Sequence, residues 1–474
     1  MDDLQRENDA LKKENQALLD RVVELERLVK QLTEQLNQNS RNSSWPSSRD
    51  KSRQSNSKVQ RKSSKRKAGG QPGHQGHTLK MTADPDEIIV HQPTCCHHCH
   101  TVLAADTPVT AVSKRQVLDL PPLRFLTTEH QAHTLRCQQC GVTTQATFPN
   151  SVTHPVQYGS RVKQLAIYLR TEQFVPYQRS RQLLQDLFNL PICVGSLQNF
   201  VARAAEQTAA PVAAIKDAIM QAPVVHADET GFYIGGKRNW LHTASTLQLS
   251  YFFPHQKRGR IAVDAIGILP HVNGTLVHDA WPTYFLYDTA HALCHAHHLR
   301  DLTAIIENDS HLWATQMRAF LRATKALVDE AKLLDNTQLP AATIVQIETL
   351  YDAIVLNGLS ETPLPEPQLP GKRGRPKRTK ARNLVERFAK HKATMLRFTY
   401  DFKVPFDNNL AERDIRMMKV QQKVSGCFRS QAGAEQFCKL RSYTSTIRKQ
   451  GLSVWQALGS LFSDSILMPQ LTPV

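Results

Sequence analysis

Three acidic residues, far apart in the sequence, have the types and settings of a metal-dependent active site. They are Asp228 in PVVHADETG, Asp279 in GTLVHDAWPTY and Glu412 in PFDNNLAERDIR. Asp228 and Asp279 each close a short apolar run typical of a buried strand, whereas Glu412 opens a helical pattern. Two carboxylates at neighbouring strand ends and a third on a helix can hold paired divalent cations, which suits in-line attack on a phosphodiester. We therefore predict that these acids bind Mg²⁺ (or Mn²⁺) and act in catalysis.

The elements around the first two acids follow the order of a ribonuclease-H-like sheet and so predict an α/β fold. We expect strands in APVVHADE, RNWLHTAST and LSYFFP, a helix after the basic turn HQKRGR, a strand in GTLVHD, a short strand in YFLYD and a helix beginning near His291. In this topology the ends of the first and fourth strands are neighbours, so Asp228 and Asp279 can share a metal. A helical stretch, 306–360, and a basic connector precede Glu412.

The segment around Glu412 has the features of a helix that faces DNA. The cluster Asp407-Asn408-Asn409 is expected to cap the helix, and Glu412 then lies in the first turns, where the positive end of the helix dipole favours carboxylates. Basic residues follow at steps of three and four and would form a stripe for DNA phosphates: Arg413, Arg416, Lys419 and Lys423. A surface helix with Glu–Arg pairs is the alternative explanation.

Other residues near these motifs are further candidate ligands. Glu229 adjoins Asp228, and three more acids lie nearby in the sequence: Asp264, Asp288 and Asp407. Potential transition-metal ligands gather in a second group: His291, Cys294, His295, His297 and His298. Within that group Cys294 and His298, and also His291 and His295, would be one helical turn apart. A second zinc site and plain helix packing are both open for it.

Two Cys-x-x-Cys pairs predict a structural zinc module. Cys96-x-x-Cys99 and Cys137-x-x-Cys140 are separated by a span that we expect to be rich in strands. Two such knuckles suit a tetrahedral four-thiolate Zn²⁺ site of the ribbon type, which is closed and not catalytic. Further potential ligands crowd the first knuckle and leave the choice there open: Cys95, His97, His98 and His100. Four unligated cysteines are the alternative.

The first 40 residues keep a seven-residue leucine repeat. The leucines, assigned to position d, are Leu4, Leu11, Leu18, Leu25 and Leu32, and position a then holds Asn8, Asn15, Val22, Val29 and Leu36. Leucine at d with Asn or Val at a favours a parallel two-stranded coiled coil, because buried Asn pairs disfavour other registers. We expect a homodimer or higher oligomer through residues 1–40; a lone amphipathic helix packed on its own protein is the alternative.

The charge of the chain favours a polyanionic partner. The 474 residues carry a formal net charge of +17, and no apolar stretch approaches the roughly 20 residues that span a bilayer. Residues 41–82 are rich in Ser, Lys and Arg and cannot bury enough apolar surface to fold alone. The start, MDDLQREN, has no hydrophobic signal region, so we expect no export.

Two more segments are candidate DNA contacts. The helical region 158–207, with Ser196 as the expected N-cap of its second helix, has a helix-turn-helix-like pattern, although simple packing explains it equally well. The segment 371–378 contains a Gly-Arg-Pro core from which Arg373 and Arg375 could enter a narrow A·T minor groove. A charged solvated loop is the alternative for the second segment.

Together these motifs resemble transposases of the bacterial insertion sequence 66 family, which are DDE enzymes. The resemblance covers nearly the whole chain: the leucine-repeat helix, GGQPGHQGH, the Cys-x-x-Cys pairs, HADET, the Asp279 segment, CHAHHLR, DNNLAERDIR and the ending SYTSTIRKQGLSVWQAL. It implies that Asp228, Asp279 and Glu412 are the catalytic acids and that a helical insertion interrupts the ribonuclease-H-like core before the glutamate. It also favours a role beside the site for His297 and Arg300, such as contact with the scissile phosphate.

One stretch departs from the family pattern. After DNNLAERDIR the chain has MMKVQQKVSGCFRS, where many family members carry a stretch like RPxxxGRKNWLF. The chain therefore resembles a divergent branch of the family.

These inferences divide the chain into segments. They are a coiled-coil helix (1–40), a basic linker (41–82), a zinc-binding module (83–152), a helical DNA-binding segment (153–215), the first part of the catalytic core (216–305), a helical insertion with basic connector (306–380), the core completed by the Glu412 helix (381–425) and a C-terminal helical region (426–474).

The predicted protein is a DNA transposase of an insertion sequence, which cuts at the element ends and transfers the strand into target DNA. Its expected partners are the double-stranded DNA of the element ends and of the target, further copies of itself and accessory proteins of the same element. No membrane partner is expected. Its expected location is the bacterial cytoplasm, with the nucleoid. A catalytically inactive DNA-binding regulator, and a metal-dependent DNA endonuclease without strand transfer, are the alternatives; the intact acids argue against the first.

Overall fold

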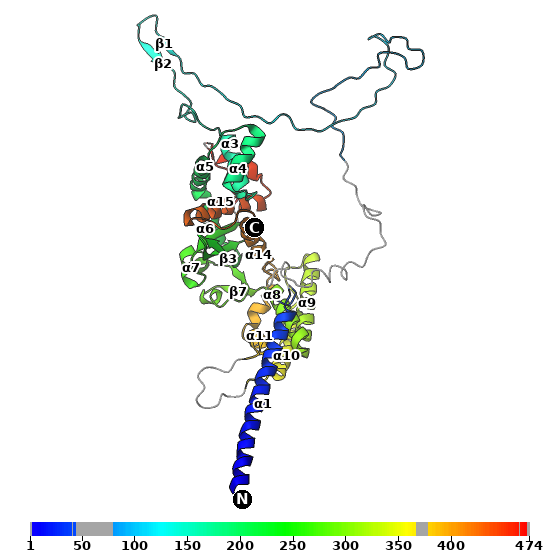
Figure 1. The fold of residues 1–474 in the computed structure, drawn as a ribbon, viewed down its shortest axis with the longest axis vertical. Helices are drawn as coiled ribbons and strands as arrows, with labels where there is room; N and C mark the ends of the chain where they lie inside the picture. The colour runs from blue at the N-terminus through cyan, green and yellow to red at the C-terminus, as the bar shows by residue number, and fades with distance from the viewer. Residues whose placement is uncertain (1, 40, 44–78, 366–377, 464, 472–474) are drawn as a thin grey trace. The chain divides into compact units, whose positions relative to one another are not determined.

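The architecture is seen in a computed structural model that describes residues 2–39, 41–43, 79–365, 378–463 and 465–471 (Figure 1). The chain forms two units: residues 52–127 with 187–189, and the remainder. Within the described ranges, no helix combines the length and apolar character needed to cross a bilayer. The GGQPGHQGH motif, most of the basic linker, Arg373 and Arg375 lie outside the described residues.

Helix α1 (Asp2–Asn37) occupies the predicted leucine-repeat segment. Leu18, Leu25 and Leu32 on it are 56%, 54% and 58% exposed. The single chain thus leaves part of its leucine stripe uncovered, as a helix that pairs with another copy requires. The coiled coil itself stays a prediction.

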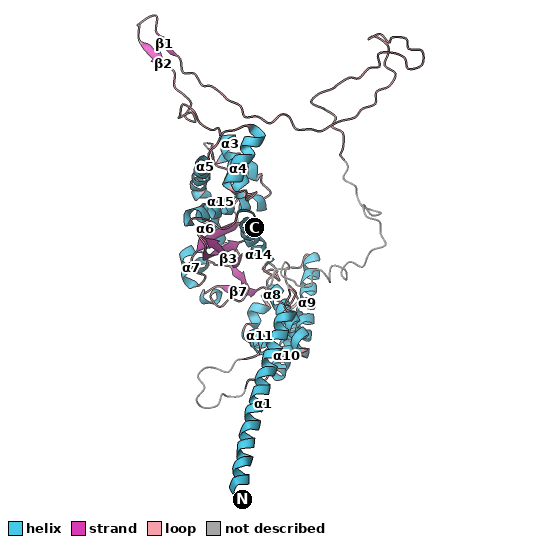
Figure 2. Ribbon diagram, viewed as in Figure 1, coloured by secondary structure: helices cyan, strands magenta, loops and turns pink. Residues whose placement is uncertain are grey.

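A five-stranded mixed sheet forms the centre of the larger unit (Figure 2). Its strands are β3 (Val224–Ile234), β4 (Lys237–Ser245), β5 (Ser250–His255), β6 (Thr275–His278) and β7 (Ala290–Leu293). The order across the sheet is β5-β4-β3-β6-β7, with β3, β4 and β5 antiparallel and β6 and β7 parallel to β3. Helix α7 (Arg260–Ile266) precedes β6, as predicted. The architecture is consistent with a ribonuclease-H-like core.

Two predictions for the region after β6 were wrong. Part of the expected strand YFLYD forms a 3₁₀ turn, η3 (Tyr284–Leu286), and the fifth strand is β7 instead. The helix expected near His291 begins at His295 (α8, His295–Asp309), because His291 lies within β7. The aromatic run was misleading because Tyr284 packs into the apolar core with residues of α7 and does not extend the sheet.

The helical insertion after β7 has a core that continues into the sheet. Its main helices are α8, α9 (Leu312–Leu333), α10 (Ala341–Glu361) and α11 (Lys380–Lys390), followed by the short α12 (Lys392–Met395) and α13 (Arg397–Tyr400). Trp313, Tyr351 and Phe388 are fully buried among them. Val277 of β6 and Leu293 of β7 belong to the same apolar cluster. The predicted helical stretch 306–360 is therefore confirmed, and it packs against the sheet edge.

Two C-terminal helices complete the sheet. Helix α14 (Asn409–Ser425) packs on β3 and β4, and α15 (Gln431–Lys449) packs along β5. Met418 of α14 shares a buried cluster with Phe232, Leu241 and Phe437. The position of Glu412 is therefore set by apolar packing of its own helix on the strand that carries Asp228.

The predicted helix pair forms, but its expected cap was wrong. The helices before the sheet are α3 (Ser160–Thr171), α4 (Tyr177–Phe188), α5 (Val194–Gln207) and α6 (Ala209–Met220). Cys193 is the N-cap of α5, because its Sγ accepts the N–H of Ser196 at 3.3 Å. Ile167 of α3 and Val201 of α5 are buried against α15 and α16 (Val454–Ser460). Packing thus explains the apolar faces, and DNA contact by this pair stays a prediction.

A buried ion pair joins these helices to α15. Glu172, whose side chain is 1% exposed, accepts hydrogen bonds from Arg441 Nη1 at 2.6 Å, from Thr444 Oγ1 at 2.7 Å and from Arg448 Nη2. Burial acts to raise the pKa of Glu172, but Arg441, Thr444 and Arg448 outweigh it and lower that pKa. The carboxylate therefore stabilises the folded state at neutral pH. This contribution is lost as the pH falls below about 4.3 and through the lower folded pKa.

Replacing Glu172 with Gln should reduce the free energy of unfolding by about 3–5 kcal/mol, because Arg441 is left buried without its charge partner. Denaturant unfolding measures the loss. Glu206→Gln, at an exposed position of α5, is the control and should change stability by less than about 0.5 kcal/mol. Equal stability of the two variants would show that the ion pair contributes nothing.

Candidate active site and metal centres

Asp228 and Asp279 lie side by side on neighbouring parallel strands. The β3–β6 ladder ends with the pair His226↔Val277, and each acid follows two residues after its member of that pair. Asp279 comes directly after β6, as expected, but Asp228 lies within β3, which continues to Ile234, so the expectation that it ends a strand was wrong. Asp228 Oδ1 accepts its neighbour's N–H, from Glu229, at 2.8 Å, and Asp279 Oδ1 accepts the N–H of Trp281 at 3.0 Å. The chain turns sharply after Asp279, where Ala280 has a φ of 70°. A left-handed non-glycine residue is costly and is often found at functional sites.

Glu412 joins these two acids from the first turn of α14. The pKa of Asp228 is raised well above its ordinary value, first by burial and then by the negative charges of Glu229, Asp279 and Glu412. Glu412 Oε1 is buried and has no hydrogen-bond partner among the described residues. Carboxylates that repel one another are suited to binding a divalent cation. Among the described residues, however, the ligand atoms that lie within 4.8 Å of one another join Glu412 to Cys294 and His297 and not to the other two acids.

Asn408 ties the three site-bearing segments together. Its Nδ2 donates to Ala227 O at 2.8 Å, which leaves its Oδ1 to accept from His226 Nδ1 at 2.8 Å. Its backbone N–H donates to Cys294 Sγ at 3.1 Å. Asn408 occupies the N-cap position of α14, but its side chain does not cap the helix. Asp407 Oδ1 instead accepts the N–H of Asn409 at 3.0 Å, so the predicted cap is only partly correct.

Asp414 anchors the opposite side of α14. Its Oδ2 accepts hydrogen bonds from Ser245 Oγ at 2.7 Å, Ser250 Oγ at 2.9 Å and Lys449 Nζ at 2.6 Å. Residues two apart on an α-helix point about 200° apart. Asp414 therefore holds the helix to β4, β5 and α15 while Glu412 is directed elsewhere.

Glu229 is engaged in a charge pair of its own. Arg258 Nε donates to Glu229 Oε1 at 2.8 Å, and Tyr284 Oη donates to Glu229 Oε2. The guanidinium of Arg258 lies over the rings of Trp240 and Trp281, at 5.0 and 4.4 Å from their centroids. This pairing makes Glu229 a poor candidate for an additional metal ligand.

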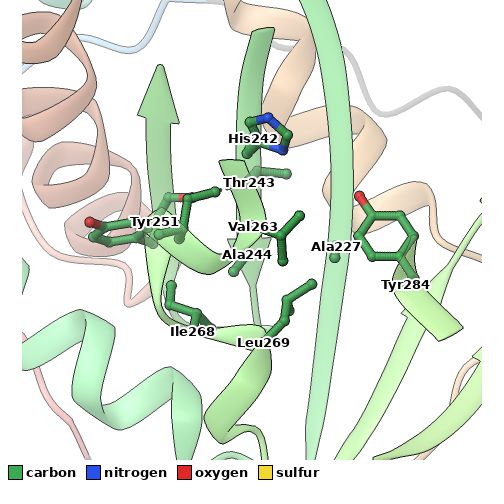
Figure 3. Close-up of a pocket in the computed structure, with 10 residues that line it drawn as sticks. Ala227, His242, Thr243, Ala244, Tyr251, Val263, Ile268, Leu269 and Tyr284 are labelled. Carbon is green, nitrogen blue, oxygen red and sulfur yellow. Dashed lines mark hydrogen bonds between the residues drawn. The ribbon is translucent and has the colours of Figure 1, made fainter. Parts of the chain in front are cut away.

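The remaining candidate acids lie in different settings. Asp264 accepts a hydrogen bond from Tyr287 Oη at 2.7 Å, Asp288 is exposed, and Asp407 lies just before the N-cap of α14. The arrangement singles out no fourth carboxylate. Beside Ala227 of β3, a small, partly open cavity of about 20 Å³ is lined by His242, Tyr251 and Tyr284, among others (Figure 3). Such a volume holds about one water molecule and no substrate.

His297 and Arg300 lie beside Glu412, where the resemblance places them. His297 Nδ1 is 3.6 Å, and Arg300 Nη2 3.9 Å, from Glu412 Oε1. The other histidines of the predicted cluster turn elsewhere. His295 Nε2 contacts Met395 O at 2.8 Å, His298 packs against Phe388, and His291 contacts His278 at 3.1 Å.

Basic residues of α14 divide between two settings. Arg413 and Arg416 are exposed and line an open hollow of about 410 Å³ with Asp407, Asn409 and Glu412. The ammonium of Lys419 donates to Gly231 O and so is attached to β3. The predicted stripe is therefore interrupted at Lys419, because its side chain reaches back to the sheet.

The two Cys-x-x-Cys turns have the same backbone hydrogen bonds. In the first, Cys96 N–H donates to Thr101 O and His100 N–H to Cys96 O, both at 2.9 Å. In the second, Cys137 N–H donates to Val142 O at 2.8 Å and Gly141 N–H to Cys137 O at 2.9 Å. The residue after each second cysteine is left-handed, with φ of 58° at His100 and 72° at Gly141. Each turn is thus a knuckle that presents two thiols.

Hydrogen bonding favours thiolates in both knuckles. It lowers the pKa of Cys99 to about 7, chiefly through the Thr101 hydroxyl, and lowers the pKa of Cys137 through the Cys140 backbone. The expected strand-rich span between the pairs was wrong. The strands β1 (Thr134–Arg136) and β2 (Thr143–Gln145) instead flank the second knuckle, and residues 103–133, all described, contain no strand.

A mixed sheet with one acid on its central strand and a second directly after the neighbouring parallel strand, completed by a glutamate from a later helix, is the pattern of a DDE-type phosphoryl-transfer core. Comparison with protein families agrees. The model of the Transposase IS66 family matches residues 155–436, more than half of the chain, and the zinc-finger binding domain of transposase IS66 matches residues 93–141. Residues 2–80 match a family of unknown function (DUF6444). A search of curated proteins found no match. The chain therefore belongs to the IS66 family of transposases.

Three parts of the site were not identified from the sequence: Asn408 as a connector, the Asp414 anchor and the Arg258–Glu229 pair. Asn408 and Asp414 stand in the DNNLAERDIR motif, which was the available signal. Arg258 stands in an ordinary basic turn, and only the folded chain shows that it lies between two tryptophans.

Asn408→Ala should lower the free energy of unfolding by about 2–4 kcal/mol, because it removes two buried hydrogen bonds and leaves His226 and Ala227 O unpaired. Denaturant unfolding measures the change. The matched control is Asn409→Ala, an exposed neighbour in the same motif, whose effect should stay within about 0.5 kcal/mol. A neutral Asn408→Ala variant would contradict the connecting role.

Proposed function

We propose that this chain is a DNA transposase that cleaves at the ends of its element and joins the freed 3′-hydroxyl to target DNA. The observation that carries the proposal is the convergence of Asp228 and Asp279, two residues beyond the same ladder pair, with Glu412 of α14. Burial raises the pKa of Asp228 most, followed by the charge of Glu229, and the charges of Asp279 and Glu412 add to the shift because they lie near it.

Asp228, Asp279 and Glu412 would hold the divalent ions, Mg²⁺ or Mn²⁺, that supply Lewis-acid stabilisation and an activated oxygen nucleophile to phosphoryl transfer. The protein's contribution is to keep three carboxylates close together against their repulsion. Asn408 fixes Glu412 against the strand of Asp228, and the Asp414 anchor prevents α14 from turning. Glu229 is paired with Arg258, so Asp228 and Asp279 would remain available to the cation.

Basic residues around the acids would position the DNA. Arg413 and Arg416 border the open hollow next to Glu412, where a phosphate backbone can approach them. His297 and Arg300, beside the same carboxylate, are suited to the scissile phosphate. Lys419 would contribute less, because its ammonium is occupied. Arg373 and Arg375 remain candidates for a minor-groove arm.

The segments outside the core would recognise element ends and assemble the complex. The four cysteines Cys96, Cys99, Cys137 and Cys140 would bind one structural Zn²⁺, supported by the two matching knuckles. The zinc module, the helix pair and the basic linker would supply end recognition and salt-dependent affinity. The exposed leucines of α1 would pair two copies of the chain. The domain limits predicted above remain part of this proposal.

An assay with labelled terminal inverted repeats, Mg²⁺ or Mn²⁺ and a target plasmid tests the function. A transposase gives cleaved ends and joined products. A catalytically inactive regulator binds the ends without cutting them, and a plain endonuclease cuts them without joining. Accessory proteins of the same element should be supplied in a parallel reaction, so that their absence is not mistaken for inactivity.

Asp228→Asn, Asp279→Asn and Glu412→Gln should each reduce end cleavage by roughly a thousandfold or more, because each removes a charge needed for the cation. Gel assays of cleaved ends measure the loss, and DNA-binding assays should show that the ends are still bound. Asp288→Asn, an exposed acid close in sequence to Asp279, serves as the control and should keep activity. Substantial cleavage by any of the three variants would exclude that residue from the triad.

The purified chain should retain a single zinc ion after weakly bound metal is removed, and Cys96→Ser and Cys137→Ser should each lose it. Metal analysis by mass spectrometry measures the content. Cys193→Ser replaces another exposed cysteine and should keep the zinc. If each knuckle variant kept its full zinc content, the two pairs would not share one ion.

A further inference from the structure

A second set of ligand atoms lies around Glu412, apart from the acids of β3 and β6. Cys294 Sγ, a ring nitrogen of His297 and a carboxylate oxygen of Glu412 all lie within 4.8 Å of one another. Cys294 is the N-cap of α8, His297 lies in its first turn, and Glu412 lies in the first turn of α14. Thiolate, imidazole and carboxylate together form the ligand set of zinc-like ions.

Two polar atoms of this cluster make no hydrogen bond. His297 Nδ1 and Glu412 Oε1 are both buried, and neither has a hydrogen-bond partner among the described residues. Their separation of 3.6 Å is too long for a hydrogen bond. Two ligands on a tetrahedral zinc ion with bonds of about 2.0–2.1 Å would be separated by about 3.3 Å. A small contraction would therefore let both atoms bind one ion.

We propose that Cys294, His297 and Glu412 form a binding site for a divalent transition-metal ion of the zinc and cobalt class, with a fourth position open to water. Because Glu412 belongs to both ligand sets, this ion competes with the Mg²⁺ bound by the three acids. The binding site stands on the geometry alone, whereas the competition rests on the proposed function.

The surroundings make this a site for an exchangeable ion. The N–H of Asn408 donates to Cys294 Sγ at 3.1 Å and orients the sulfur. On binding, the metal–sulfur bond forms and the thiol proton passes to solvent, so that thiolate and carboxylate balance the two charges of the ion. Arg300 Nη2, 3.9 Å from Glu412 Oε1, opposes a cation. This repulsion weakens the binding of the ion, so that the ion exchanges and is not a permanent structural zinc.

An ion can reach the cluster from solvent. Cys294 is fully buried, but the side chains of His297 and Glu412 are 29% and 24% exposed. Glu412 also borders the open hollow lined by Arg413 and Arg416. The fourth ligand position would be filled from that side.

Cobalt titration of the full-length chain tests the site. The knuckles are first loaded with zinc, and weakly bound zinc is then removed so that the exchangeable site is empty. Zinc binds such ligands more tightly than cobalt, so added Co²⁺ should leave the knuckles occupied. The expected result is one saturable Co²⁺ with a thiolate-to-cobalt charge-transfer absorption. Cys294→Ser should abolish that absorption. Cys427→Ser, which alters an exposed cysteine after α14, is the matched control and should retain it.

Two further variants keep the test decisive if Cys294→Ser does not fold. His297→Ala and Glu412→Gln each remove one ligand and should weaken Co²⁺ binding by more than the roughly 10–100-fold that outer-shell changes cost. The proposal is overturned if no thiolate–cobalt absorption appears after zinc loading. It is also overturned if that absorption survives in folded Cys294→Ser.

Competition is measured separately, as end cleavage in Mg²⁺ with increasing Zn²⁺. Cleavage by the Cys427→Ser control should fall as in the unaltered chain, whereas any residual cleavage by Cys294→Ser should resist zinc. Zinc-insensitive cleavage by the unaltered chain would refute the competition. If that chain did not cleave element ends at all, the proposed function would fail, while the cobalt spectrum would still decide the binding site.

Discussion

The buried amide of Asn408 is the contact on which the arrangement of the acids depends. It bonds to His226 and Ala227, directly before Asp228, while its backbone N–H bonds to Cys294 at the start of α8. These partners are 182, 181 and 114 residues away along the chain. An amide that satisfies a donor and an acceptor on β3 fixes both the distance and the direction of approach of α14. Local helix formation alone would fix neither.

The two faces of α14 make different contacts. Asp414 is held by two serines and Lys449 on the side of β4, β5 and α15. Glu412, two residues earlier, keeps one carboxylate oxygen without a hydrogen bond. An unpaired buried acceptor is costly unless a ligand satisfies it. Anchoring one acid firmly therefore allows the other to remain available.

A similar division holds beside the sheet, where one acidic residue is paired and its neighbour is not. Glu229 is paired with Arg258, whose guanidinium lies over the rings of Trp240 and Trp281. The backbone N–H of Trp281 also donates to the carboxylate of Asp279. The Arg258–Glu229 pair thus links the turn after β6 to the residue beside Asp228, and it occupies the carboxylate of neither Asp228 nor Asp279. Burial, and then the neighbouring negative charges, raise the pKa of Asp228, and a bound cation would offset both effects.

Four of the five strands, the acids Asp228 and Asp279, and the cysteine knuckles were predictable from local patterns, whereas the fifth strand, β7, was not. Apolar runs, short-range spacing and helix periodicity are properties of neighbouring residues, and the chain expresses them wherever it folds. YFLYD misled because its aromatic residues serve the core equally well from a turn. Ser196 misled because a cysteine three residues earlier could accept its N–H.

The sequence by itself determined which residues are candidate metal ligands and where four of the five strands lie, and it placed Asp279 directly after one of them, although Asp228 proved to lie within β3 and not at its end. Only the tertiary structure decided that Asn408 and Asp414 hold α14, that Glu229 is paired, and that Cys294 and His297 meet Glu412. The physical reason is that these contacts join residues far apart in the chain. Their formation depends on the packing of whole helices against the sheet, and no local spacing encodes it.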